Sequence, residues 1–255
     1  MKTKNLYYTT FFKRKSIIKE ISLFVFVFVI SWPRILLEVF IRKNFGERYF
    51  SLVKAILISI FLFFIPISID KVASFGGKSV IAIIFTNISW YIFLTAFLYF
   101  CFKRQKEVKR EPGVFDFAKF SYYNGDIDER FYNVKIKGRE ITRRLICTLI
   151  EPAFFCLIGI VLSIFMQKVG ILILFCSLCY SLGYVGEYVR GDHFIMDTID
   201  KMISNEEMVN SFVDGREPEE TRGFETYGRK PADPDFRRRM VDNFFDHEEE
   251  IYTAS

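Results

Sequence analysis

Four long, mostly apolar blocks constrain this chain more than any other feature of its sequence. They cover residues 50–69, 80–102, 145–166 and 169–189. Each block reaches the length of about 20 residues that a helix needs to cross the hydrocarbon core of a bilayer. The sequence therefore predicts an all-α polytopic membrane protein in which four transmembrane helices form a bundle.

A fifth apolar block covers residues 21–33 and follows basic residues. It is shorter than a transmembrane helix requires, and no small-residue cleavage site follows it, as a signal peptide would need. An amphipathic helical pattern continues from it as far as residue 45. We therefore expect residues 16–45 to form one or two helices in the membrane interface, with Lys and Arg at the headgroups. A fifth span at 21–33 is the alternative.

The distribution of Lys and Arg predicts the orientation. Residues 1–49 carry ten basic and three acidic side chains, and residues 103–144 carry twelve and seven. Cytoplasmic segments near span ends are enriched in Lys and Arg, so both segments are expected in the cytoplasm. With four spans the chain crosses the membrane an even number of times, so the C-terminus is expected in the cytoplasm as well. This predicts a multi-pass membrane protein with both termini cytoplasmic.

The prediction divides the chain into six segments. They are a basic interfacial region (1–49), a transmembrane hairpin (50–102), a cytoplasmic loop (103–144), a second transmembrane hairpin (145–189), a cytoplasmic helix (190–213), and an acidic linker with a terminal amphipathic helix (214–255). The linker, residues 214–233, has few aliphatic side chains and is expected to be flexible.

The terminal helix carries one apolar stripe. Its members are Phe236, Met240, Val241, Phe244 and Phe245. The basic residues near the start of this helix and the acidic residues at its end oppose the helix dipole, so the helix is expected to need a surface on which to form. Two surfaces stay open: the chain's own cytoplasmic helices, or a binding partner.

The four predicted spans contain three charged side chains, Lys54, Glu151 and Glu187. A charge inside a membrane costs about 2.5–3.5 kcal/mol on insertion scales, so each one calls for a partner or a function. The predicted topology brings all three to a similar depth, where Lys54 and Glu151 can form an ion pair between helices. The structural interpretation is a lock between spans. The functional alternative is the ion or proton site of a small transporter or channel.

Sequence signatures of enzymes are absent. The chain has no P-loop, dinucleotide-binding glycine motif, HExxH or GxSxG. Cys176 and Cys179 have CxxC spacing, but they lie in an apolar run without a His or a second CxxC, so we expect them to pack as apolar side chains. His193 and His247 also lack neighbouring ligands. The sequence therefore predicts no catalytic residue, metal or cofactor, and a protein that is not an enzyme.

The placement of polar sequence favours a membrane scaffold. The external connections are short, so recruitment of other membrane or cytoplasmic proteins is expected through residues 103–144 and 190–255. Basic and aromatic residues alternate in 103–144, as in some nucleic-acid-binding segments. Anionic lipid and topology account for that pattern, so nucleic acid is not the expected partner. Small residues at four-residue spacing, such as Gly159 and Ser163, allow close helix packing and a homo-oligomer.

Several short motifs follow one another in a particular order over residues 45–200. They are the run Phe45-Gly46-Glu47-Arg48-Tyr49-Phe50-Ser51-Leu52, then Glu151-Pro152 with Gly159, then Tyr188, Arg190, Asp197 and Asp200. This layout resembles uncharacterised multi-span membrane proteins that accompany conjugation or secretion genes on mobile elements. The resemblance implies a component of a bacterial conjugation or secretion assembly in the inner or plasma membrane, and it brings no catalytic role with it.

Overall fold

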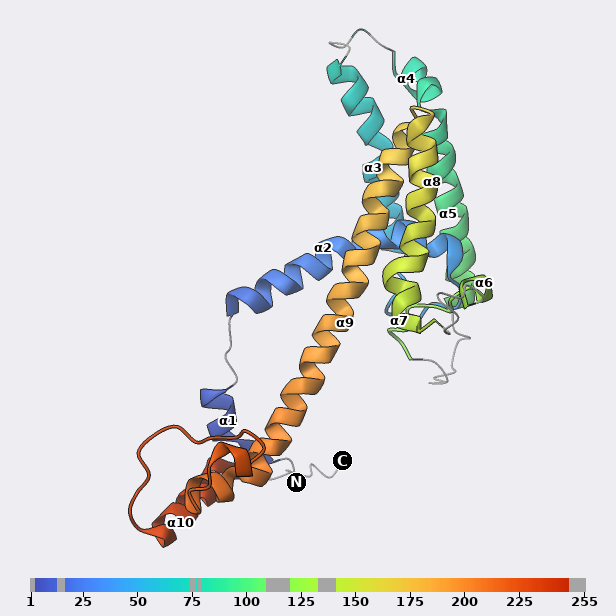
Figure 1. The fold of residues 1–255 in the computed structure, drawn as a ribbon. Helices are drawn as coiled ribbons and strands as arrows, with labels where there is room; N and C mark the ends of the chain where they lie inside the picture. The colour runs from blue at the N-terminus through green and yellow to red at the C-terminus, as the bar shows by residue number, and fades with distance from the viewer. Residues whose placement is uncertain are drawn as a thin grey trace, which may run out of the picture. The chain divides into compact units, whose positions relative to one another are not determined.

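A computed structural model of the chain describes residues 3–12, 17–73, 77, 79–108, 120–132 and 141–247 (Figure 1). The described chain is almost wholly helical. It forms two compact units, which we describe separately. The bundle unit is Leu23–Tyr188. The terminal unit combines Met1–Ser22 with Val189–Ser255.

Five long helical segments build the bundle unit. They are α2 (Ile17–Ile41), α3 (Leu52–Ala73), the pair α4 (Val80–Thr86) and α5 (Ile88–Val108), the continuous run α7 (Arg143–Leu145), η1 (Ile146–Ile150) and α8 (Glu151–Ile164), and the first half of α9 (Lys168–Met208). In the described part of the loop between α5 and α7 lies a short helix, α6 (Glu129–Tyr132). Among the described residues, four helices are long and apolar enough to cross a membrane, or five if the bent pair α4 and α5 counts as one span.

The predicted spans at 50–69, 145–166 and 169–189 are helical, and the last runs on beyond residue 190 as expected. The block at 80–102 differs from prediction, because α4 and α5 meet at an angle of 79°. Asn87 lies at the break. Its amide Nδ2 donates to the Asp70 carboxylate at 2.7 Å and to the Ile83 carbonyl at 2.8 Å. Lys168 forms an ion pair with the same carboxylate, so the bend joins α3 to the start of α9.

Helix α2 is longer than the apolar block at 21–33 indicated. The helix continues through Pro33 to Ile41, and its apolar part, Ile21–Ile41, is 21 residues long. In Figure 1 the part of α2 within the bundle unit passes across α5 and α8 and does not run alongside them. Its exposed apolar side chains include Val25, Phe28 and Val29. Arg34 and Arg42, predicted at the headgroups, are instead buried inside the protein.

One apolar core fills the bundle unit. It includes Leu37 and Val39 of α2, Leu62 of α3, and Phe97 of α5, all at most 5% exposed. The contact between α8 and α9 depends on small residues, as predicted for Gly159 and Ser163. A Cβ atom added to Gly170 would lie 2.6 Å from the Ser163 backbone nitrogen and 2.8 Å from the Gly159 carbonyl.

Part of the 103–144 loop is tied to the chain between α2 and α3. Backbone N–H groups of Gly46 and Arg48 donate to the carbonyls of Tyr123 and Ser121, at 2.7 and 2.8 Å. The N–H of Asp126 donates to the Lys43 carbonyl at 2.8 Å. Residues 109–119 and 133–140 of this loop lie outside the described residues. The described part packs on the protein through this backbone ladder.

The terminal unit joins the two ends of the chain. Strand β1 (Thr3–Asn5) pairs antiparallel with β2 (Phe245–His247), with Lys4 opposite Asp246. Helix α1 (Leu6–Phe11), the end of α9, η2 (Val209–Val213), η3 (Pro218–Glu220) and α10 (Pro234–Phe244) complete the unit. Its apolar core is formed by Tyr7, Met208, Phe212, Val213, Phe224 and Val241.

One prediction for the tail is wrong. Residues 214–233 are not an open linker, because they are hydrogen-bonded to the rest of the terminal unit. The Tyr7 hydroxyl donates to the Tyr227 carbonyl at 3.1 Å, and the Ser211 hydroxyl accepts from the Thr226 N–H at 3.1 Å.

The predicted partner-binding stripe on α10 is mostly covered from within. Val241 is in the core, and Met240, Phe244 and Phe245 pack against it. Phe236 alone of the stripe is exposed. Of the two surfaces left open for this helix, α10 packs on the chain's own terminal unit.

Candidate functional site

A row of charged side chains on α2 forms the base of the site. Arg34, Glu38 and Arg42 follow each other at four-residue spacing, which places them on one helix face. All three are at most 4% exposed. That face is covered by Glu151 of α8 and by Tyr180, Tyr184 and Glu187 of α9. We call these seven residues, together with Tyr49, the buried ionic network.

Arg42 is the best-satisfied member of the network. Its Nε donates to Glu151 Oε1 at 3.2 Å and its Nη2 donates to Glu151 Oε2, so the pair is bidentate. The other donors reach the Asn124 carbonyl at 3.1 Å, the Cys147 Sγ at 3.0 Å and the Tyr184 hydroxyl. All five N–H donors of the guanidinium therefore have acceptors, which is the condition for burying a charge at tolerable cost.

Tyrosine hydroxyls satisfy the buried carboxylates. Tyr180 donates to Glu151 Oε2 at 2.5 Å. Glu38 accepts from Tyr184 at 2.6 Å and from Tyr49 at 2.7 Å. Burial, and then the neighbouring Glu38 carboxylate, raises the pKa of Tyr49 well above its ordinary value. Tyr49 therefore keeps its proton and serves as a donor.

Arg34 connects the network to its partly exposed end. Its Nη1 donates to Glu187 Oε1 at 2.8 Å and its Nη2 to the Tyr49 hydroxyl at 3.0 Å. The guanidinium carbons of Arg34 and Arg42 lie 4.5 and 4.8 Å from the centroid of the Tyr184 ring. These distances are typical of cation–π contacts. Two arginines thus share one tyrosine, and α2 is fixed to α9 by charge, hydrogen bonds and ring contact together.

The predicted pairing of Lys54 with Glu151 is wrong. Lys54 is exposed and has no ion pair among the described residues. Glu151 pairs with Arg42, and Glu187 pairs with Arg34. The sequence prediction missed both partners because it assigned the α2 arginines to the lipid headgroups. The four-residue spacing of Arg34, Glu38 and Arg42 was the signal that could have revealed a charged face turned inward.

The balanced charges and hydrogen bonds of the network are suited to holding α2, α8 and α9 together. Two arginines and the two fully buried glutamates balance in charge, and each of the four has a charged or hydroxyl partner. Within the described residues, no group of three or more His, Cys, Asp or Glu side chains could hold a metal ion. Cys176 and Cys179 are buried beside each other on α9 as free cysteines.

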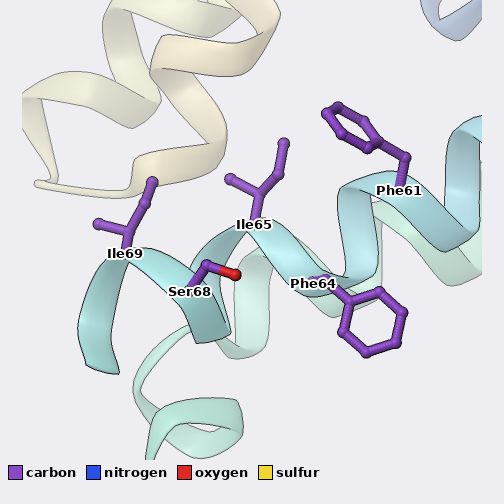
Figure 2. A pocket seen from close by; sticks show the side chains of 5 residues that line it. All are labelled: Phe61, Phe64, Ile65, Ser68 and Ile69. Carbon is purple, nitrogen blue, oxygen red and sulfur yellow. The ribbon is translucent and has the colours of Figure 1, made fainter. Parts of the chain in front are cut away.

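A hollow lies on the surface of α3. Figure 2 shows its lining of Phe61, Phe64, Ile65, Ser68 and Ile69, all from one helix. Phe61, Ile65 and Ile69 project from one side of α3, while Phe64 projects from another (Figure 2). Its volume is about 320 Å³, and Ser68 supplies its single polar side chain. Because α3 is a candidate span, this surface has the character of a lipid-facing groove.

Comparison with protein-family models, with curated proteins and with solved structures found no match for the chain. Two residues of the motifs that carry the family resemblance have structural roles here. Gly46 lies against the backbone of Ser121, and Glu151 is the buried partner of Arg42.

Proposed function

We propose that this protein is a non-enzymatic membrane scaffold that holds its terminal unit on the cytoplasmic side as a docking platform for other proteins. One observation carries the proposal. The two ends of the chain, separated by every candidate span, pair as β1 and β2 and share an apolar core. A folded unit of this kind, attached to apolar helices, supports a role in presenting a surface.

The strand pair also bears on the number of membrane crossings. If β1 and β2 are paired, both lie on one side of the membrane, and the chain crosses it an even number of times. Five candidate spans are available when α4 and α5 count as one. We propose that four of them cross and that α2 lies in the interface. Its crosswise path and its inward-facing charges support this assignment, which matches the behaviour of interfacial helices.

Charge supports the cytoplasm as the side that holds the terminal unit. Residues 1–49 and 103–144 hold most of the Lys and Arg near the candidate spans, and such segments are retained in the cytoplasm. The motif resemblance supports a bacterial inner membrane and a conjugation or secretion assembly as the setting.

The transporter alternative loses the contact on which it was based. It required Lys54 and Glu151 to form a shared site, and Glu151 is instead closed off by Arg42 and Tyr180. We therefore put forward no second function.

A recovery experiment from native membranes tests the proposal. The tagged full chain is crosslinked in cells, purified, and its partners are quantified by mass spectrometry. Val241→Asp places a charge in the terminal core, since Val241 is 4% exposed, and should abolish partner recovery while leaving the protein in the membrane fraction. Phe236→Asp, an exposed position on the same helix, is the matched control and should keep the terminal core folded. Equal partner recovery from Val241→Asp and wild type would contradict the proposal.

A further inference from the structure

The stretch of α9 within the terminal unit exposes large apolar side chains. Every residue from 189 to 200 is exposed. Among them, Phe194 is 72% exposed, Ile195 57% and Ile199 49%, and Met202 in the next turn is 57% exposed. We call Ile195, Ile199 and Met202 the docking face.

Membrane crossing does not account for this exposure. A span needs about 20 residues, so a span that starts at Lys168 is complete near residue 188. The docking face begins after that point. Contiguous apolar surface outside the membrane marks a site of interaction.

Helical geometry makes the docking face one surface. Ile195, Ile199 and Met202 are separated by four and three residues, so their side chains lie along the same side of the helix. Helix α1 contacts this stretch through the Tyr8 hydroxyl, which donates to the Asp197 carbonyl at 3.1 Å. The face is therefore a stripe of about two helical turns, the size that a single amphipathic helix can cover.

The acidic character of this stretch indicates which kind of partner the docking face binds. Residues 192–206 contain four acids, Asp192, Asp197, Asp200 and Glu206, against one lysine, Lys201. A second copy of α9 would bring the same acids against them, and like charges repel. An anionic membrane surface would be repelled for the same reason. A helix with apolar side chains on one face and Lys or Arg at its flanks complements the surface in both respects.

We infer that the docking face binds a basic amphipathic helix of a partner protein. This inference rests on the proposed function and names its partner class. The partner helix lays its apolar side chains on Ile195, Ile199 and Met202, while its basic residues face Asp200. Glu206 already forms an ion pair with Arg222 within the terminal unit.

Photo-crosslinking in native membranes tests the inference. The photoreactive residue benzoylphenylalanine replaces Ile199 in the full chain, and replaces the exposed Phe236 as the matched control. We expect an adduct from position 199 whose crosslinked peptide, sequenced by mass spectrometry, is a basic amphipathic segment of another protein. Charge reversal by Asp200→Lys should lower that adduct severalfold, while an Asp200→Asn change should lower it less.

Four outcomes would overturn the inference: an adduct with a second copy, adducts with lipid alone, a crosslinked peptide that is not basic, or no adduct at position 199. The proposed function fails on a different result, namely recovery of the same partners when Val241→Asp has disrupted the terminal core. If partner recovery depends on the terminal core but crosslinks form only at position 236, the proposed docking platform is supported and the assignment of the docking face is wrong.

Discussion

Arg42 and Glu151 form a bidentate ion pair in which neither side chain is exposed. The pair connects the end of α2 to the beginning of α8, two segments separated by 109 positions. Removing one member of a buried pair leaves a charge without a partner and costs about 3–5 kcal/mol. Loss of either member alone should therefore destabilise the bundle unit.

A double-mutant cycle tests this contact. We expect Arg42→Met and Glu151→Gln each to destabilise the purified protein by about 3–5 kcal/mol. The double variant should lose clearly less than the sum, because it leaves no unpaired charge. Unfolding in increasing SDS is followed with a thiol-reactive dye, since Cys101, Cys147, Cys176 and Cys179 are buried. The exposed Lys54→Met is the control, with an expected change within about 0.5 kcal/mol. Strict additivity would show that the pair does not couple the helices.

Gly46 is placed where a side chain does not fit. A Cβ atom there would lie 2.4 Å from the Ser121 carbonyl oxygen and 2.5 Å from the Tyr123 nitrogen, and both are backbone atoms. We expect Gly46→Ala to cost about 1–3 kcal/mol, the usual range for overpacking. Gly186→Ala on α9 is the control, because its nearest atoms are side-chain carbons at 3.7 and 3.8 Å. The same SDS titration should show no loss for the control, and equal stability of the two variants would refute the close approach.

Length and hydropathy were enough to predict a membrane protein and the positions of three spans. The bend at Asn87 was not predictable from apolar length, because it depends on Asp70 and Lys168 arriving from other helices. The partners of Glu151 were missed for a similar reason, since a pair separated by 109 positions leaves no local pattern. The fold-back of the tail depends on Tyr7 at the opposite end of the chain.

Asn5 connects the N-terminus to the end of α9. Its side-chain oxygen caps α1 by accepting from the Tyr8 N–H at 2.9 Å, and its Nδ2 donates to Asn205 at 2.7 Å and to Ser204 at 3.1 Å. Asn5→Asp keeps the cap and loses both donors, whereas Asn5→Ala loses all three bonds. We expect Asn5→Ala to cost more than the 1 kcal/mol or so of a lost cap, with Asn5→Asp in between. Hydrogen exchange across α1 and the end of α9 measures this order, and unchanged protection in Asn5→Ala would contradict it.

Glu207 makes the terminal unit sensitive to acid. Hydrogen bonds from Asn210, and then from Arg222, lower the pKa of the Glu207 carboxyl. A carboxyl whose pKa is lowered in the folded state stabilises the fold above the ordinary Glu value of about 4.3. That stabilisation is lost as the pH falls from there through the lowered pKa. Protection factors for residues 203–227 should fall with pH in this window in the wild type and change less in Glu207→Gln. Identical pH profiles of the wild type and Glu207→Gln would show that Glu207 does not cause the acid sensitivity.

The central claim is that the two chain ends lie together on one side of the membrane, and a designed disulfide tests it directly. Lys4 and Asp246 lie opposite each other in the β1–β2 register, and opposed antiparallel residues have Cα separations of about 4.5–5.5 Å, within disulfide range. Lys4→Cys with Asp246→Cys is oxidised in sealed native membranes, with each single variant as a control. We predict a disulfide within one chain and, after reduction, labelling of both cysteines from the same side by a membrane-impermeant maleimide. Labelling of the two positions from opposite sides, with no disulfide formed, would contradict the account.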